Sequence, residues 1–233
     1  MSCIDSSLWI KICGLMIPEQ AVTIARQGAS ALGFICVRSS PRYVTPLQIR
    51  AMSQALIATS LSGVERVGVF VNATSAELET AITTGQLTAL QLHGQETPAR
   101  CQQVRQAFPQ LKLIKALRIR SEADLSAVQS YEAIVDAILL DAYHPDRLGG
   151  TGETLDWRSL RTFQPAIPWI LAGGLTPDNI ETALTQLSPQ GIDLSSGVEL
   201  SPGNKCLTQV ESLFATLNTL SAGQGSQAKT VAG

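Results

Sequence analysis

The sequence predicts an α/β protein built as a closed parallel barrel of eight β/α units. Short apolar runs rich in β-branched residues alternate with longer segments of helical period. This alternation implies parallel strands with right-handed crossovers. Residues 8–220 allow about 27 residues for each of eight units, enough for a strand, a helix and two short loops. A doubly wound open sheet is the alternative, but no G-x-G-x-x-G motif follows the first strand.

The eight apolar runs expected as strands are residues 8–13, 31–37, 64–71, 89–93, 112–117, 137–141, 169–172 and 191–194. Helices are expected between them, among them residues 18–27, 46–60, 75–84, 98–107, 122–130, 155–163 and 177–187. Thr45, Thr97 and Thr176 each precede a proline, and this pairing predicts an N-cap hydroxyl followed by proline at the first helical position.

Composition excludes several classes of protein. The chain has 233 residues, 45% of them hydrophobic, and a formal net charge of −2, which argues against disorder throughout the chain. Nucleic-acid binding is not expected because no basic cluster is present. The most apolar stretch, residues 133–140, is short and contains Asp136, so no membrane span is expected. We expect one barrel domain over residues 8–220, an N-terminal extension over 1–7, and a flexible tail over 221–233.

Five scattered cysteines and two histidines fit neither a disulfide framework nor a zinc site. A reducing cytoplasm is the expected compartment, and no secretory signal is visible. In a parallel barrel the active site lies at the carboxyl ends of the strands. Cys13 ends the first strand, and Lys11 points to the same side, where its charge would favour the thiolate. The alternative is a buried structural thiol; Cys36 is expected near the end of the second strand.

Asp141 closes the very apolar sixth strand, where a carboxylate is costly unless it is hydrogen-bonded or catalytic. A raised pKa there would suit a general acid, whereas a loop anchor is the alternative. His93 ends the fourth strand and could reach the barrel mouth or serve structurally. His144, Glu153 and Asp156 are expected to be exposed or capping residues.

Small residues follow the last two strands and predict a phosphate site. Backbone N–H groups approach an anion most closely where no Cβ intervenes, and many barrels hold phosphate at this position. Tight turns are the alternative reading. The residues concerned are Gly173, Gly174, Ser195, Ser196 and Gly197. Arg42, on the loop after the second strand, could grip a carboxylate in a bidentate fork, or could be an ordinary surface arginine.

Taken together, the motifs resemble those of phosphoribosylanthranilate isomerases, the family of tryptophan biosynthesis. They run in order from the first strand to the eighth: KICG (11–14), SPRYV (40–44), VGVFVN (67–72), QLHGQE (91–96), LDA (140–142), GGTG (149–152), LAGGLTP (171–177) and SSGVE (195–199). Two departures from the family pattern are the segment 36–38 after the second strand, and Cys206 where an aspartate is common.

The resemblance implies a (β/α)8 TIM barrel that catalyses the Amadori rearrangement of N-(5-phosphoribosyl)anthranilate. By motif, Cys13 would be the general base and Asp141 the general acid. Arg42 would bind the anthranilate carboxylate, and the glycine and serine loops would bind the phosphate, with His93 and Lys11 as further substrate-binding residues. No metal or organic cofactor is implied, and we expect a monomer or homodimer.

Two other classes of function are weighed against this one. Another phosphate-binding barrel, such as an indoleglycerol-phosphate synthase or a thiamine-phosphate synthase, would need a lysine and glutamate set, or a diphosphate and metal site, at these strand ends. A non-catalytic phosphosugar-binding barrel would bind without turnover. The pair Cys13 and Asp141 favours the isomerase.

Overall fold

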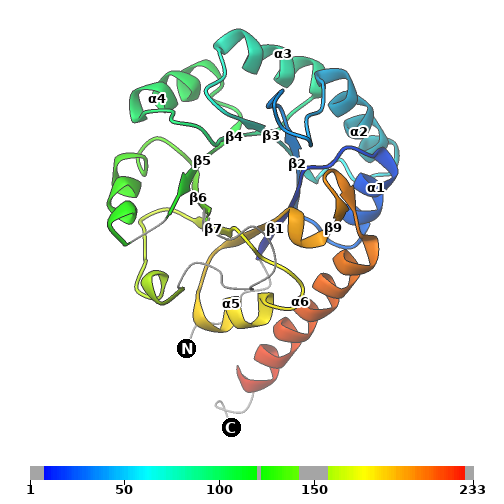
Figure 1. Ribbon diagram of the computed structural model, residues 1–233, viewed down its shortest axis with the longest axis vertical. Helices are drawn as coiled ribbons and strands as arrows, with labels where there is room; N and C mark the ends of the chain where they lie inside the picture. Colours follow the sequence, from blue (N-terminus) through cyan, green and yellow to red (C-terminus); the bar gives the residue numbers. More distant parts are fainter. Residues whose placement is uncertain (1–7, 120–121, 142–156, 229–233) are drawn as a thin grey trace.

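The computed structural model describes residues 8–119, 122–141 and 157–228. Eight parallel strands close into a barrel in chain order, with the eighth paired to the first, and the helices surround it (Figure 1). The strands are β1 (Trp9–Cys13), β2 (Ala31–Ile35), β3 (Glu65–Phe70), β4 (Ala89–Leu92), β5 (Lys112–Arg118), β6 (Ala137–Asp141), β7 (Trp169–Ala172) and β8 (Gly191–Leu194). This confirms the expected closed barrel and rules out the open sheet.

The α-helices are α1 (Pro18–Arg26), α2 (Pro46–Ala58), α3 (Ser75–Gly85), α4 (Pro98–Ala107), α5 (Ile180–Gln186) and α6 (Leu207–Ala228). The caps predicted at Thr45 and Thr97 are confirmed, since each hydroxyl accepts a hydrogen bond from a backbone N–H three residues later. The cap predicted at Thr176 is wrong. There the Asn179 side chain accepts from Thr176 N and donates to Gly174 O, and this side-chain-stabilised turn delays the helix to Ile180.

Two expected helices are present as 3-10 helices. The helix expected over 122–130 is η1 (Glu122–Ser130), and within the described part of the segment expected over 155–163 only η2 (Trp157–Leu160) is helical. The polar run after β8 contains elements that were not predicted, the short 3-10 turn η3 (Ser196–Val198) and a hairpin of β9 (Glu199–Ser201) and β10 (Asn204–Lys205). Helix α6 extends to Ala228, past the expected start of the tail at 221, because an established helix elongates at little cost. Residues 1–7 and 229–233 lie outside the described residues.

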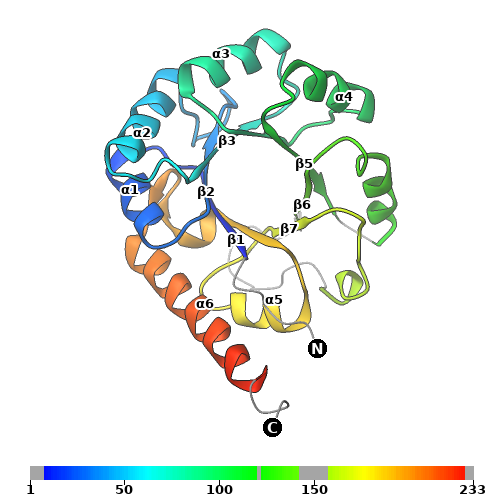
Figure 2. The same ribbon diagram turned by 180° about the vertical axis from the view of Figure 1, so that it is seen from behind.

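Two apolar layers hold the barrel together. Between the strands and the helices lies a large buried cluster to which Phe34, Met52 and Leu171 belong. Inside the barrel a second, smaller layer consists mostly of small residues: Ala31, Val67, Ala89, Ile114, Ala116, Ala137, Leu139, Ile170 and Ala172. These alanines leave room for long polar side chains near the carboxyl ends of the strands. Figure 2 shows the ring from the opposite side. No described helix is both long and apolar enough to span a bilayer.

Candidate active site

A cavity of about 280 Å³ opens at the carboxyl ends of the strands, where the sequence places its candidate residues. Its wall combines residues from seven of the eight strands and their loops. Lining it are Cys13, Ile35, Ser40, Arg42, Val69, Gln91, His93, Asp141, Ala172, Gly173, Gly174, Leu175, Asp193, Ser195, Ser196 and Gly197. The cavity therefore gathers nine of the ten candidate site residues; Lys11 lies behind its wall.

Cys13 belongs to a buried charged group on β1 and β8. Lys11 Nζ lies 2.6 Å from Asp193 Oδ2, and its charge acts on the Cys13 thiol. A Cβ on Gly33 of β2 would come within 2.6 Å of Cys13 Sγ and 2.9 Å of Lys11 Cε, so glycine is required there. The second oxygen of Asp193, Oδ1, is buried without a hydrogen-bond partner among the described residues.

This surrounding sets the acidity of the thiol. Burial raises the pKa of Cys13 above its ordinary value, and the charges of Lys11 and Lys205 oppose that shift. The pKa of Lys11 is raised, because attraction to Asp193 and Cys13 exceeds the effect of burial, which acts in the opposite direction. Burial also raises the pKa of Asp193. The thiolate is therefore costly to form, and the two lysines reduce that cost.

Asp141 ends β6, which is three strands from β1 around the ring by way of β8 and β7. His93 Nε2 is 3.2 Å from Asp141 Oδ2, and His93 Nδ1 is 3.1 Å from Gln91 Nε2. The side chains of His93 and Asp141 are each about one-fifth exposed, whereas Gln91 is buried. The carboxyl group thus faces the cavity with one oxygen held by an imidazole.

Arg42 reaches the cavity from the β2–α2 loop and is hydrogen-bonded to the β9–β10 hairpin. Its Nε and Nη2 atoms bond the Glu199 carboxylate at 2.6–3.0 Å, and Lys205 Nζ lies 2.6 Å from the same carboxylate. Burial opposes ionisation of Glu199, but hydrogen bonds from Arg42 and Lys205 outweigh it and lower the pKa. Arg42 and Lys205 are both paired with the Glu199 carboxylate, so these three side chains together carry one net positive charge beside the cavity.

The loops after β7 and β8 form the remaining wall. Gly173 and Gly174 both have positive φ, of 91° and 65°, a conformation that glycine adopts without strain. A Cβ on Gly197 would collide with Leu175 O. Ser195 donates its hydroxyl to Cys13 O at 3.1 Å, which ties the β8 loop to β1. The backbone therefore comes close to the cavity on this side, as an anion site requires.

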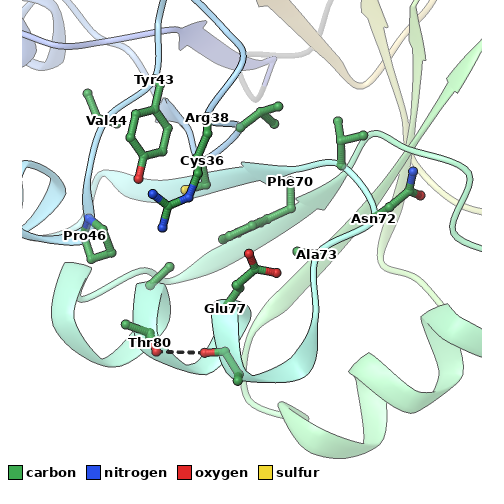
Figure 3. Close-up of a pocket in the computed structure, with 14 residues that line it drawn as sticks. Cys36, Arg38, Tyr43, Val44, Pro46, Phe70, Asn72, Ala73, Glu77 and Thr80 are labelled. Carbon is green, nitrogen blue, oxygen red and sulfur yellow. Dashed lines mark hydrogen bonds between the residues drawn. The ribbon is translucent and has the colours of Figure 1, made fainter.

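Cys36 lies elsewhere. It lines a separate groove of about 430 Å³ between the β2–α2 loop, the end of β3 and α3, with Phe70 and Arg38 nearby (Figure 3). Its thiol donates to Phe34 O at 3.6 Å, and burial raises its pKa to about 12. The structure thus places Cys36 outside the cavity that holds Cys13. His144, Glu153 and Asp156 lie outside the described residues.

Four polar residues of this region were not among the candidates: Gln91, Asp193, Glu199 and Lys205. A sequence signal existed for Asp193, since a carboxylate interrupts an apolar strand and barrel closure pairs its strand with the one that carries Lys11. The contacts of Glu199 and Lys205 depend on a hairpin that the sequence did not predict. Within the described part of the chain, no group of three or more His, Cys, Asp or Glu residues could hold a metal ion.

Comparison with known proteins agrees with this geometry. The family model "N-(5'phosphoribosyl)anthranilate (PRA) isomerase" matches residues 10–216. An N-(5'-phosphoribosyl)anthranilate isomerase of Synechococcus elongatus is 61% identical over 210 residues, covering 90% of this chain and 96% of that protein. That of Acaryochloris marina is 55% identical over 213 residues, covering 91% of this chain and 98% of its own length.

Solved structures show the same relationship. The phosphoribosyl anthranilate isomerase of Thermotoga maritima superposes with a TM-score of 0.81 at 33% identity, covering 91% of this chain and 99% of that one. Another, solved in complex with reduced 1-(o-carboxyphenylamino)-1-deoxyribulose 5-phosphate, gives a TM-score of 0.76 at 30% identity, covering 91% and 99%. Fold, site and sequence agree, and the chain belongs to the N-(5'-phosphoribosyl)anthranilate isomerase family.

Proposed function

We propose that Cys13 is the general base and Asp141 the general acid of the family reaction. That reaction, an isomerisation in tryptophan biosynthesis, converts N-(5'-phosphoribosyl)anthranilate into 1-(o-carboxyphenylamino)-1-deoxyribulose 5-phosphate. The observation that carries the proposal is that a thiol and a carboxyl group from β1 and β6 line one cavity, together with two glycine-containing loops.

The chemistry needs one acid and one base. Asp141 gives its proton to the ribose ring oxygen, the bond from that oxygen to C1' breaks, and the nitrogen lone pair forms a C1'=N iminium. The Cys13 thiolate then takes the proton from C2', and the C–H electrons form a C1'=C2' double bond as the iminium nitrogen becomes neutral. Conversion of this enol to the ketone completes the isomerisation without net gain or loss of atoms. The iminium serves as the electron sink.

The two groups differ in surroundings as these roles demand. A base that attacks carbon benefits from nearby cations that favour its thiolate, and Lys11 and Lys205 act on Cys13 in this direction. An acid that releases its proton to the ring oxygen must face the cavity, and Asp141 is partly exposed there.

Arg42 is proposed to bind the anthranilate carboxylate. Glu199 occupies the Nε and Nη2 edge of the guanidinium, so a second carboxylate would meet the Nη1 and Nη2 edge. The one net positive charge of Arg42, Lys205 and Glu199 favours such an anion. The phosphate is proposed to bind the loops at Gly173–Gly174 and Ser195–Gly197, supported by their closely approaching backbone. Lys11, being fully buried, is proposed to act through Cys13 rather than by touching substrate.

The experiment is turnover of freshly generated substrate, followed by loss of its fluorescence, for the wild type and two variants. Cys13→Ala and Asp141→Asn should each lower kcat by about 10²–10⁴-fold, the usual contribution of one general acid or base. Inorganic phosphate should still inhibit both variants competitively. Undiminished turnover in either variant would refute the role proposed for that residue.

We further propose a cytoplasmic location and a monomer or homodimer. The described cysteines Cys13, Cys36, Cys101 and Cys206 are all free, which suits a reducing compartment. A related isomerase from Thermotoga maritima is dimeric. Light scattering of the purified full chain would distinguish one subunit from two, and a larger assembly would contradict the proposal.

A further inference from the structure

Gln91 is the buried end of a hydrogen-bonded chain that leads to the candidate acid. Its side chain lies inside the barrel on β4, between Val69 and Ile114 of the neighbouring strands. Gln91 Nε2 contacts His93 Nδ1 at 3.1 Å, and His93 Nε2 contacts Asp141 Oδ2 at 3.2 Å. Gln91 Oε1 is buried and has no partner among the described residues.

The atom that Gln91 presents decides which imidazole nitrogen carries the proton. An amide nitrogen donates, so Nδ1 accepts and the proton of neutral His93 resides on Nε2. An amide oxygen would accept, which would place the proton on Nδ1 and leave Nε2 as an acceptor facing Asp141. The structure has the first arrangement. It leaves the buried Gln91 carbonyl oxygen without a partner among the described residues, whereas the reverse would leave an amide NH₂ there, which is the rarer kind of unpaired buried group.

The tautomer determines what His93 can do to Asp141. With its proton on Nε2, His93 donates to Asp141 Oδ2 and cannot accept a proton at that nitrogen. The acidic proton of Asp141 therefore belongs on the other oxygen, Oδ1, from which it would pass to the ribose ring oxygen. With the proton on Nδ1, Nε2 would instead compete with the substrate for the proton of Asp141.

We propose that Gln91 is a positioning residue that holds His93 in the Nε2-protonated tautomer and so reserves the Asp141 proton for the substrate. The second half of this inference rests on the acid role proposed for Asp141. The first half, the tautomer, does not. Gln91 is linked to Asp141 only through His93, and it acts on the acid through that imidazole.

Other charged groups lie close to the hydrogen-bonded series Gln91–His93–Asp141. Asp193 of β8 interacts electrostatically with both His93 and Asp141, and its own charge is balanced by Lys11 of β1. Cys13 and Arg42 line the same cavity. A neutral amide at position 91 adds no charge to this group, so it can select a tautomer without shifting the acid electrostatically.

The tautomer can be measured directly because the chain has only two histidines. Long-range ¹H–¹⁵N spectra of histidine-labelled full-length protein, assigned with a His144→Gln variant, show which ring nitrogen of His93 is protonated. The wild type should show the Nε2-protonated form. Gln91→Met keeps the length of the side chain but removes the amide, and should give a mixture of tautomers. Gln91→Glu should put the proton on Nδ1 or give the imidazolium, since its carboxylate only accepts.

Kinetics then test the consequence. Gln91→Glu should lower kcat about tenfold or more with KM nearly unchanged, the direction known for a misplaced histidine tautomer. Gln91→Met should lie between wild type and Gln91→Glu. Gln102→Met on the exposed face of α4 is the matched control and should change nothing.

Each of these outcomes either supports the inference or overturns it. An Nδ1-protonated wild type, or a Gln91→Glu variant that keeps the wild-type tautomer, would overturn the inference. A changed tautomer with unchanged kcat would overturn the link to Asp141. If Asp141→Asn stays fully active, the proposed acid role fails, while the tautomer result stands on its own evidence.

Discussion

Two buried lysine–carboxylate pairs lie under opposite halves of the barrel mouth, and they differ in how completely they are satisfied. Lys115 on β5 donates to Leu92 O, Gly94 O and Glu96 Oε2, at 2.8–3.2 Å, which uses all three of its protons. Both oxygens of Glu96 also accept backbone N–H groups, from Asn72 and Gly94. Lys11 instead donates to Asp193 and acts on the Cys13 thiol through its charge, and Asp193 Oδ1 has no hydrogen-bond partner among the described residues.

The difference separates a structural pair from a functional one. Lys115 and Glu96 fix the turn after β4 that follows His93, and they do not line the cavity. Lys11 and Asp193 border the thiol, and an unpaired buried oxygen is a cost that a purely structural pair would not carry. We infer that the first pair acts through stability and the second through the acidity of Cys13. The predictions below test this division.

The largest expected effect is on stability. Lys115→Met leaves the Glu96 carboxylate buried without its counter-charge, which should lower the free energy of unfolding by about 3–5 kcal/mol. Lys112→Met, on the same strand but in a partly exposed pair with Glu65, should cost under about 1 kcal/mol. Urea unfolding of both variants measures the difference. Equal losses of unfolding free energy in the two variants would contradict the claim that burial makes the Lys115–Glu96 pair costly to break.

A smaller effect is expected on the pH dependence of catalysis. Lys11 lowers the pKa of Cys13, so Lys11→Met should raise that pKa and move the acidic limb of kcat/KM to higher pH. At pH values below that limb, kcat/KM of Lys11→Met should be about tenfold below that of the wild type for each unit by which the pKa of Cys13 rises. Lys112→Met should leave the limb in place. An unmoved or lowered limb in Lys11→Met would show that this lysine does not tune the base.

The smallest expected effect is the order in which the free thiols react. Cys206 is half-buried, and its hydrogen bond with Thr208 lowers its pKa, so among the described cysteines iodoacetamide should modify it first. Burial raises the pKa of Cys101, beside Glu96, to about 11, and Cys36 and Cys101 should react last. Peptide mass mapping over pH 7–9 gives the order. Modification of Cys101 before Cys206 would be inconsistent with the closed environment of the Glu96 pair.

The sequence predicted the barrel and most of its site because strand order and strand ends follow from simple patterns. Cys13 and Asp141 each end an apolar run, and barrel geometry brings such ends to one face. The partners of these residues were harder to see. Asp193 meets Lys11 only because the eighth strand closes on the first, and Glu199 meets Arg42 across an unpredicted hairpin. Such contacts depend on tertiary packing, and local periodicity carries no signal for them.

The division of labour between Cys13 and Asp141 is tested most directly by a primary isotope effect with substrate deuterated at C2'. In Cys13→Ser, removal of the C2' proton should limit the rate, so the effect on kcat should exceed that of the wild type. In Asp141→Asn, ring opening should limit the rate and the effect should fall toward unity. A large isotope effect in Asp141→Asn together with none in Cys13→Ser would contradict the assignment of acid and base.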